Sequence, residues 1–322
     1  MDWLNTLEGF LRQIDSIDPV VIQKLKFENM PERFYKYRVF GEWTFDNLKE
    51  GREWAVSPLG FNDPFDCALN IQLDAKSKPI FQKYYPVLVD RFRQETGIQI
   101  NDDTSKLIAQ AEDPISELLT QAKPWLLREM DPAEFNAFAQ AFRAAQIQYL
   151  AKLSTSMRTH LASQVAVVPL TVKVDSIPMW SYYADSHRGF CVEYDLKSLG
   201  PENLQVRALY PVLYNTEWPN ATDTTVQAVA PSEGMTDNTT ILSVLTKSAE
   251  WRHEQEWRMI FPRKPDVEKF PVYLRIKAVY LGVKMLSDSK ASVVNWATEH
   301  HVRVYEMVLH RTQYRIVPNL LK

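Results

Sequence analysis

The chain has 322 residues, of which 45% are hydrophobic and 24% are charged, and these proportions are typical of a soluble globular protein. The formal net charge of −3 excludes the strong positive field of proteins that bind nucleic acid in bulk, although it is compatible with a local basic groove. Two cysteines are too few for a disulfide framework or a four-cysteine zinc site, and they favour a reducing compartment, the cytoplasm.

Targeting and nucleotide-binding signals are also missing from the sequence. Residues 1–10 contain no basic segment and no long apolar run, so we expect no signal peptide. No stretch reaches the roughly 18 apolar residues that a membrane span needs, so we expect no membrane partner. The chain contains neither a GxGxxG nor a GxxxxGK[ST] motif, which excludes glycine-rich phosphate loops.

The first 29 residues are predicted to form a pair of helices. Apolar residues recur with helical spacing from Trp3 to Ile14. Asp18 and Pro19 then supply the cap and the first position of a second helix.

A strand is predicted over residues 34–39, with Lys36 and Arg38 on one of its faces. A short helix capped by Thr44 and a second strand follow. The next segment, residues 57–67, is dense in Pro, Gly, Asn and Asp, which favour turns.

Two polar residues of this turn-rich segment leave two interpretations open. Asn62 and Asp63 either bond their own backbone in a structural turn or line the mouth of a functional site.

The middle of the chain is predicted to be a helical insertion, residues 76–164. Apolar residues recur there with helical spacing, and Asp131 and Pro132 are a cap and start signal. The predicted helices cover residues 80–92, 104–111, 115–130 and 132–160.

The insertion divides an α+β core made of residues 30–75 and 165–322, for which we expect a central, mostly antiparallel sheet. Residues 215–237, rich in Thr, Pro, Asn and Ala, are expected to form a long surface loop. Further strands are predicted over residues 165–174, 190–195, 206–214, 273–282, 302–309 and 314–317, and further helices over 238–249 and 286–300.

The most informative segment is residues 251–261, with the sequence WRHEQEWRMIF. If a strand covers residues 255–261, its successive side chains point to opposite faces. One face is then apolar and packs on the core, with Trp257, Met259 and Phe261.

The opposite face carries Glu256 and Arg258, and Glu254 joins them if the strand starts earlier. Two carboxylates this close raise the pKa of one of them, and a nearby arginine lowers it, so this face could carry chemistry. The alternative is an edge strand with a solvated charged face. A partly exposed Glu256 would contribute roughly 0–1 kcal/mol to stability through a salt bridge.

Three blocks of sequence together resemble a bacterial family, the one described as domain of unknown function 2971. The resemblance extends over about residues 33–282, and the helical segment is longer than expected for the family. The family's name implies no activity. The blocks are residues 35–38 with 61–66 (YKYR and FNDPFD), residues 179–184 with 189–195 (MWSYYA and GFCVEYD), and Lys247, Ser248 and Trp251 with residues 254–258 (EQEWR).

A weaker resemblance, to ADP-ribosyltransferase-type folds, supplies a mechanism. An early cationic strand, a Thr-x-x-Asn-Leu-x-x-Gly stretch at residues 44–51 and a strand ending in Ser57 are similar to the opening of those folds. The residues Glu254-Gln255-Glu256 are similar to their Glu-x-Glu signature. The Ser-Thr-Ser element of those folds has its nearest counterpart in residues 56–58, which read Val-Ser-Pro.

This resemblance implies an enzyme that cleaves the nicotinamide–ribose bond of NAD, as an ADP-ribosyltransferase or an NAD glycohydrolase, and a role as a toxin or phage-defence effector. A carboxylate would stabilise the positive charge that develops on the ribose, and an arginine would hold the pyrophosphate or the ribose. The acceptor of ADP-ribose, a protein or a nucleic acid, is left open. The implied catalytic residues are Glu256 and Glu254, and the implied NAD-binding residues are Arg38, Asn62, Asp63, Ser181, Tyr182 and Tyr183, with Tyr37, Tyr182 or Tyr183 stacking on nicotinamide.

Two other classes of function fit the same residues. A metal-dependent nuclease or phosphodiesterase would bind Mg²⁺ through carboxylates drawn from Asp63, Asp66, Glu193, Asp195, Glu254 and Glu256. A non-catalytic binding module would use the Trp, Glu and Arg blocks to lock the sheet. For the enzyme we expect Arg38, Asn62, Ser181 and Glu256 to line one pocket, and we assign no resident metal site.

Overall fold

The structure is a computed structural model, and it describes residues 3–13, 17–68, 89–219, 237–263 and 267–321. The chain forms two compact units, each with its own hydrophobic core. The first unit consists of Met1–Cys67, Leu161–Glu217 and Val244–Lys322, and the second of Ala68–His160 and Trp218–Ser243.

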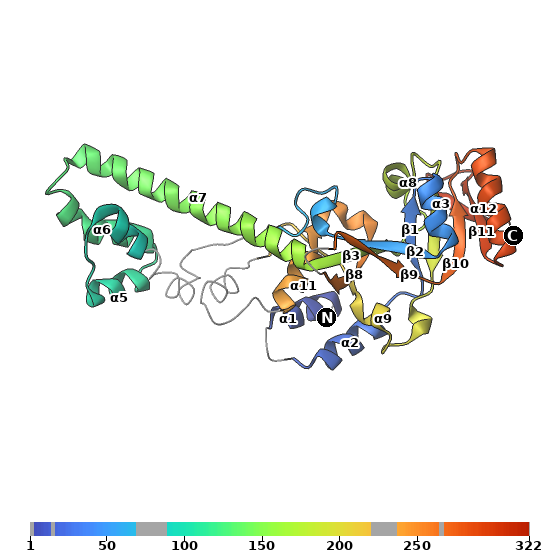
Figure 1. Cartoon of the computed structure of the whole chain (residues 1–322), viewed down its shortest axis with the longest axis horizontal. Coiled ribbons are helices and arrows are strands. Elements are labelled where there is room, and N and C mark those ends of the chain that lie inside the picture. Colours follow the sequence, from blue (N-terminus) through green and yellow to red (C-terminus); the bar gives the residue numbers. More distant parts are fainter. Residues whose placement is uncertain (1–2, 14–16, 69–88, 220–236, 264–266, 322) are drawn as a thin grey trace. The chain divides into compact units, whose positions relative to one another are not determined.

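A large sheet dominates the first unit, so the expected α+β class with a mostly antiparallel sheet is confirmed (Figure 1). Its described strands follow the order β12-β11-β10-β4-β1-β3-β2-β9, while β8 pairs with β3 and β5 pairs with β8. Among these described strands, β10 and β11 alone run parallel. The strands are β1 (Phe34–Arg38), β2 (Arg52–Val56), β3 (Val165–Thr171), β4 (Phe190–Tyr194), β5 (Leu209–Pro211), β8 (Glu256–Pro262), β9 (Lys269–Tyr273), β10 (Ile276–Leu281), β11 (Arg303–Leu309) and β12 (Ile316–Leu320).

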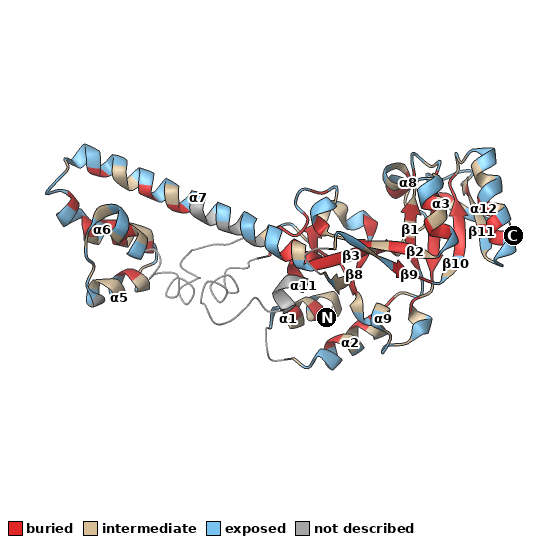
Figure 2. Ribbon diagram, viewed as in Figure 1, coloured by how far each residue is buried: buried red, intermediate tan, exposed pale blue. Residues whose placement is uncertain are grey.

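The strands bury side chains on both faces of this sheet, as the red strands in Figure 2 show. Alternation along β1 turns Phe34 toward one core cluster and Tyr35 and Tyr37 toward another. The first cluster is covered by α3 (Glu42–Lys49) and α12 (Ser287–Glu299), and the second by α8 (Ile177–Tyr183). The sheet is therefore an interior layer, and polar side chains on it need partners.

The predicted N-terminal helices are present as α1 (Trp3–Arg12) and α2 (Pro19–Glu28). The Asp18 carboxylate accepts a hydrogen bond from the Val20 amide at 2.9 Å, which is the predicted cap. Trp3 stacks on Trp257 of β8 with a ring separation of 6.1 Å. The apolar face predicted for β8 is therefore buried, and α1 helps to cover it.

The described part of the second unit is helical, as the periodicity predicts. Phe92 and Phe142 pack edge to face at 5.4 Å in its core. Asp131 accepts from the amides of residues 133 and 134, and its own amide donates to the Glu134 side chain, so it caps α7 reciprocally. Residues 76–88 of the predicted insertion lie outside the described residues. The helices are residues 89–96, α5 (Asp102–Gln110), α6 (Pro114–Leu126) and α7 (Pro132–Gln164), which ends in the first unit.

Three element predictions differ from the structure. Residues 206–214 form α9 (Leu204–Ala208), β5 and β6 (Leu213–Asn215), because Asn203 caps a helical turn through the Gln205 amide. The predicted helix 238–249 ends early: α11 (Asp237–Leu245) gives way to β7 (Thr246–Ser248), which pairs in parallel with β6. Residues 273–282 divide between β9 and β10.

Two smaller differences concern loops and caps. Gly41, and not Thr44, is the cap of α3, and the Thr44 hydroxyl instead donates to the Val39 carbonyl at 2.8 Å. Most of the predicted loop 215–237 lies outside the described residues. Within the part of the chain that is described, no helix has the length and apolar character that crossing a bilayer requires.

Gly189 fixes the end of β1 beside β4. A Cβ atom at position 189 would overlap the Arg38 carbonyl oxygen and approach the Ala184 backbone, and neither group can move freely. Gly189→Ala should therefore lower the free energy of unfolding by about 1–3 kcal/mol, measured by urea denaturation.

The matched control is Gly9→Ala in α1, where an added Cβ meets nothing within 4 Å. This change should leave the unfolding free energy unchanged or raise it by up to about 1 kcal/mol, because alanine favours helix. Equal unfolding midpoints for the two variants would contradict the packing argument.

Candidate functional site

A pocket of about 410 Å³ opens in the first unit where β1 and β3 separate. The two strands share a single register pair, Tyr35 with Thr171. Two residues earlier in β3 lies Pro169, which has no amide hydrogen to donate to a neighbouring strand. The Lys36 amine donates to the Pro169 carbonyl at 2.5 Å, so a side chain bridges the gap between the two strands. The proline in this interior strand thus interrupts the pairing of β1 with β3, and the cavity forms where that pairing stops.

The floor of the pocket is built by residues 254–256 at the start of β8. Glu254 ends a 3-10 helix, η4 (Ala249–Glu254), and Gln255 adopts a left-handed conformation with φ 43° and ψ 52°. The Thr171 hydroxyl donates to the Glu254 carbonyl at 2.5 Å and accepts from the Lys173 amide at 3.0 Å, which holds this kink in place. Glu254 and Glu256 therefore line the same pocket although Glu254 precedes the strand.

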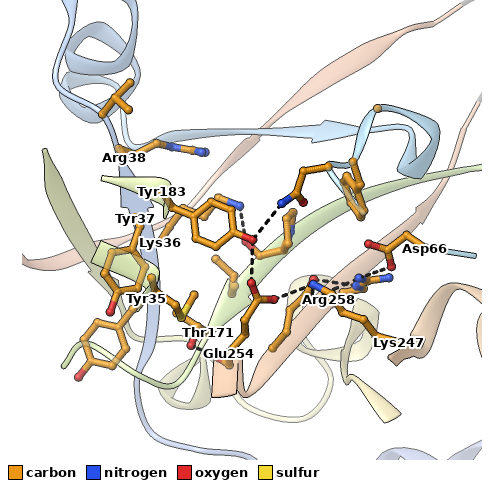
Figure 3. A pocket seen from close by; sticks show the side chains of 18 of the residues that line it. Tyr35, Lys36, Tyr37, Arg38, Asp66, Thr171, Tyr183, Lys247, Glu254 and Arg258 are labelled. Carbon is orange, nitrogen blue, oxygen red and sulfur yellow. Dashed lines mark hydrogen bonds and ion pairs between the residues drawn. The ribbon is translucent and has the colours of Figure 1, made fainter. Parts of the chain in front are cut away.

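Two buried cations hold the carboxylates of the floor (Figure 3). Lys247 of β7 donates to Glu254 at 2.6 Å and to Glu256 at 2.9 Å. Arg258 donates through Nε to Glu256 at 2.7 Å and through Nη2 to Asp66 at 2.7 Å. Its Nη1 donates to the Val244 carbonyl at 2.5 Å, so each guanidinium nitrogen has an acceptor.

Because these charged side chains are buried, their ionisation depends on their contacts with the opposite charges beside them. Arg258 has no solvent-exposed surface, and the Glu256 side chain is 7% exposed. Burial alone would raise the pKa of Glu256, but Arg258 and Lys247 outweigh it and lower this pKa from 4.5 to about 2. The same contacts outweigh the effect of burial on the cations and raise the pKa values of Arg258 and Lys247. Glu256, Lys247 and Arg258 are therefore charged at neutral pH, and Glu254 forms an ion pair with Lys247.

A neutral hydroxyl contacts the Glu254 carboxylate. Tyr183 of α8 donates to Glu254 at 2.7 Å and accepts from the Asn62 side chain at 3.4 Å (Figure 3). Burial and the negative charge of Glu254 raise the pKa of Tyr183, so the hydroxyl keeps its proton at neutral pH.

Arg38 lines another part of the pocket, with 25% of its side chain exposed. It pairs with the buried Glu53, which also accepts a hydrogen bond from Tyr194 at 2.7 Å. Burial lowers the pKa of Arg38 from its ordinary value. The guanidinium is thus oriented by the sheet and presents its remaining surface to the cavity.

The structure brings together five of the eight residues singled out in the sequence. Arg38 and Asn62 line the pocket together with Tyr183, Glu254 and Glu256. Their convergence joins four segments that are far apart in the chain.

Three of the expected residues are not among those that line the pocket. The Ser181 hydroxyl lies 3.0 Å from the Ile177 carbonyl and 3.2 Å from His187 Nε2, both within the α8 region. Tyr182 is 66% exposed, because a helix turns neighbouring residues in different directions. Asp63 accepts from the Phe65 amide at 2.8 Å and so bonds its own turn. The expected convergence therefore includes Arg38, Asn62 and Glu256 but not Ser181.

The charged face of residues 254–258 is buried, so the solvated edge-strand alternative is wrong. β8 pairs with β3 on one side and β5 on the other, which makes it an interior strand. The expectation of a partly exposed Glu256 with a weak salt bridge is wrong for the same reason, since Glu256 contacts two buried cations.

Some polar residues of the pocket were not assigned to NAD binding or catalysis from the sequence, among them Lys36, Asp66 and Lys247. The alternation of side chains along a strand places Lys36 on the same face as Arg38, and this pattern could have identified Lys36 from the sequence. Asp66 and Lys247 lie in recognised blocks, but their contacts with Arg258 and Glu256 join segments that no spacing rule connects.

The six carboxylates considered for Mg²⁺ do not gather in one place. Asp66, Glu254 and Glu256 lie in or beside the pocket, each bound to Lys247 or Arg258. Glu193 instead accepts from Tyr280 at 2.5 Å, and Asp195 pairs with Lys277 at 2.9 Å. Among the described residues, no three His, Cys, Asp or Glu side chains form a group suited to a metal ion.

Residues 179–259 match the family described as "Protein of unknown function (DUF2971)". The resemblance is thereby confirmed over the segment that supplies α8, β7 and β8 to the pocket. A search of curated proteins and of solved structures finds no match to this chain.

Glu256→Gln should lower the free energy of unfolding by about 3–5 kcal/mol, because it leaves two buried cations without their shared carboxylate. Urea denaturation measures the change. The control is Glu250→Gln on the exposed side of η4, which should stay within about 0.5 kcal/mol of wild type. A Glu256→Gln variant as stable as this control would contradict the inferred role of the buried ion pairs.

The pKa of Glu256 also predicts a pH dependence. Its folded-state pKa of about 2 lies below its ordinary value of 4.5, so its stabilising effect is complete above pH 4.5. That effect is lost as the pH falls from 4.5 toward 2. The difference in unfolding free energy between wild type and Glu256→Gln should therefore narrow over this interval, and a constant difference would contradict the role of the ionised carboxylate.

Proposed function

We propose that this pocket binds NAD and cleaves its nicotinamide–ribose bond, as an NAD glycohydrolase or an ADP-ribosyltransferase. The observation that supports the proposal best is the convergence of Arg38, Tyr183 and Glu254 on one concave, partly aromatic site. The similarity of residues 254–256 to a Glu-x-Glu signature agrees with this reaction.

The reaction needs a fixed negative charge beside the ribose. When the bond between ribose carbon and nicotinamide nitrogen breaks, its electron pair leaves with nicotinamide, which becomes neutral. Positive charge develops on the ribose, and a nearby carboxylate stabilises it. Attack by water then gives ADP-ribose and a proton, whereas attack by another nucleophile transfers ADP-ribose to an acceptor.

The contacts of the two carboxylates suggest different tasks. Both oxygens of Glu256 accept hydrogen bonds from cations, which offset its charge. One oxygen of Glu254 accepts from the neutral Tyr183 hydroxyl at the pocket. We therefore assign Glu254 to the ribose and Glu256 to holding Lys247 and Arg258.

Other pocket residues would bind the rest of the ligand. The exposed quarter of Arg38 is suited to a phosphate or a ribose hydroxyl, and the Tyr183 ring to the nicotinamide. A cytoplasmic location would give the enzyme access to NAD. Depletion of NAD would stop metabolism in a target cell, which is consistent with a toxin or a phage-defence effector.

The test is release of nicotinamide from NAD, measured by chromatography. Glu254→Gln should reduce kcat by about 10²- to 10³-fold, because it removes one preorganised electrostatic group. Tyr183→Phe should reduce it by roughly fivefold, since a hydrogen bond of about 1 kcal/mol is lost. The control is Tyr182→Phe, which alters a neighbouring tyrosine outside the pocket and should match wild type.

Two outcomes would overturn the proposal. A wild-type protein that releases no nicotinamide, with or without cell extract as a source of acceptors, is not an NAD-cleaving enzyme. Activity that disappears with EDTA would favour the metal-dependent nuclease or phosphodiesterase class, because cleavage of NAD by carboxylates needs no metal.

A non-catalytic binding module is the second candidate, and one observation favours it. Ion pairs already join the charged residues of the pocket floor, which are Lys247, Arg258, Glu254 and Glu256. This pairing is expected where charged side chains stabilise the shape of a pocket. Calorimetric binding of NAD without release of nicotinamide would support this candidate over the enzyme.

A further inference from the structure

Lys36 differs from the other cations of the pocket. Arg38, Lys247 and Arg258 each form a salt bridge with a carboxylate. Lys36 has no salt-bridge partner among the described residues, and its amine donates to the Pro169 carbonyl at 2.5 Å. It therefore enters the gap between β1 and β3 without a counter-ion.

This environment favours the uncharged amine. An ammonium group has three hydrogens to donate, and within the described part of the chain Lys36 meets one acceptor, the Pro169 carbonyl. Burial, and then the positive charge of Arg38, lower the pKa of Lys36 well below its ordinary value. Glu256 and Glu254 act in the opposite direction without offsetting this, and Lys247 adds to the lowering. The missing salt-bridge partner and these effects both favour the neutral amine, which carries the lone pair that a nucleophile needs.

We propose that Lys36 is a covalent site, at which its amine forms an imine with an aldehyde or ketone that enters the pocket. This reaction goes beyond the proposed cleavage of NAD, because it needs neither NAD nor Glu254. Lysines that serve as nucleophiles toward carbonyl groups are activated by burial in an apolar pocket or by a neighbouring positive charge.

The chemistry is balanced without an oxidant or a reductant. The Lys36 nitrogen forms a bond to the carbonyl carbon, and the carbonyl oxygen becomes a hydroxyl group. The carbon–oxygen bond then breaks, and the oxygen leaves as water with the two hydrogens that the amine carried. The departing hydroxyl needs a proton donor, and Tyr183, which lines the same pocket and keeps its proton, can supply one. Tyr183 then regains a proton from the nitrogen as the neutral imine forms, so the two hydrogens of the water come in sum from the amine.

The lining of the cavity indicates the class of carbonyl compound. Trp43, Phe61 and Tyr183 contribute aromatic surface to a volume of about 410 Å³, which fits a small aromatic molecule. The other cations of the pocket are matched by carboxylates, so the compound needs no acidic group for binding. An aromatic aldehyde is therefore a suitable probe.

The experiment uses the full-length folded chain with benzaldehyde and sodium cyanoborohydride, which traps any imine as a stable benzylamine. Modified lysines are mapped by digestion and mass spectrometry at pH 7. Lys36 should be modified about 10- to 100-fold faster than Lys24, because an ordinary lysine has only roughly one neutral amine in 10³ at this pH. Lys24 is a fair reference, since its side chain is 74% exposed.

Two variants complete the design. Lys36→Met should remove the fast modification, and Lys24→Met should leave it unchanged. Modification of Lys36 no faster than Lys24 in the wild-type chain would overturn the proposal, and this comparison stands even if Lys36→Met does not fold. Because no NAD is present, this result is independent of whether the protein releases nicotinamide.

Discussion

The buried guanidinium of Arg258 is the constraint on which the pocket depends. A charge without any solvent-exposed surface is stable only if its donors are satisfied, and here acceptors come from Glu256, Asp66 and the Val244 carbonyl. These groups belong to a strand, to the turn-rich segment 57–67 and to the end of a helix. Satisfying one side chain therefore fixes the relative positions of three segments, and the cavity forms above them.

A proline on the neighbouring strand decides where the cavity opens. Pro169 has no amide hydrogen to donate toward β1. Its carbonyl accepts a hydrogen bond from the Lys36 amine, at the point where backbone hydrogen bonds between β1 and β3 would otherwise continue. The sheet remains paired through β3 and β8, so it tolerates this local separation. The interrupted pairing of β1 with β3 thus coincides with the pocket, and Lys36, which has no salt-bridge partner among the described residues, lines it.

The balance of charge in the pocket connects its stability with its chemistry. Lys247 and Arg258 hold Glu256, while Glu254 contacts a hydroxyl that a ligand can approach. Within the described part of the chain Lys36 pairs with no carboxylate, although carboxylates lie elsewhere in the cavity. The pocket thus combines one carboxylate held by two cations, one carboxylate that contacts a neutral hydroxyl, and one lysine amine bound to a backbone carbonyl.

Local patterns in the sequence determined the elements and several members of the site. The periodicity of residues 286–300 and 302–309 predicted α12 and β11 almost to their ends, and the Asp131 cap was predicted correctly, because these signals act between near neighbours. The pattern also selected Arg38 and Glu254, both of which line the pocket. Tertiary structure alone decided that Glu256 is buried, that Asp66 reaches Arg258, and that Ser181 and Tyr182 do not line the pocket. The physical reason is that burial and ion pairing depend on which strands become neighbours, and β8 lies between β3 and β5 only when segments almost 90 residues apart in the chain come together.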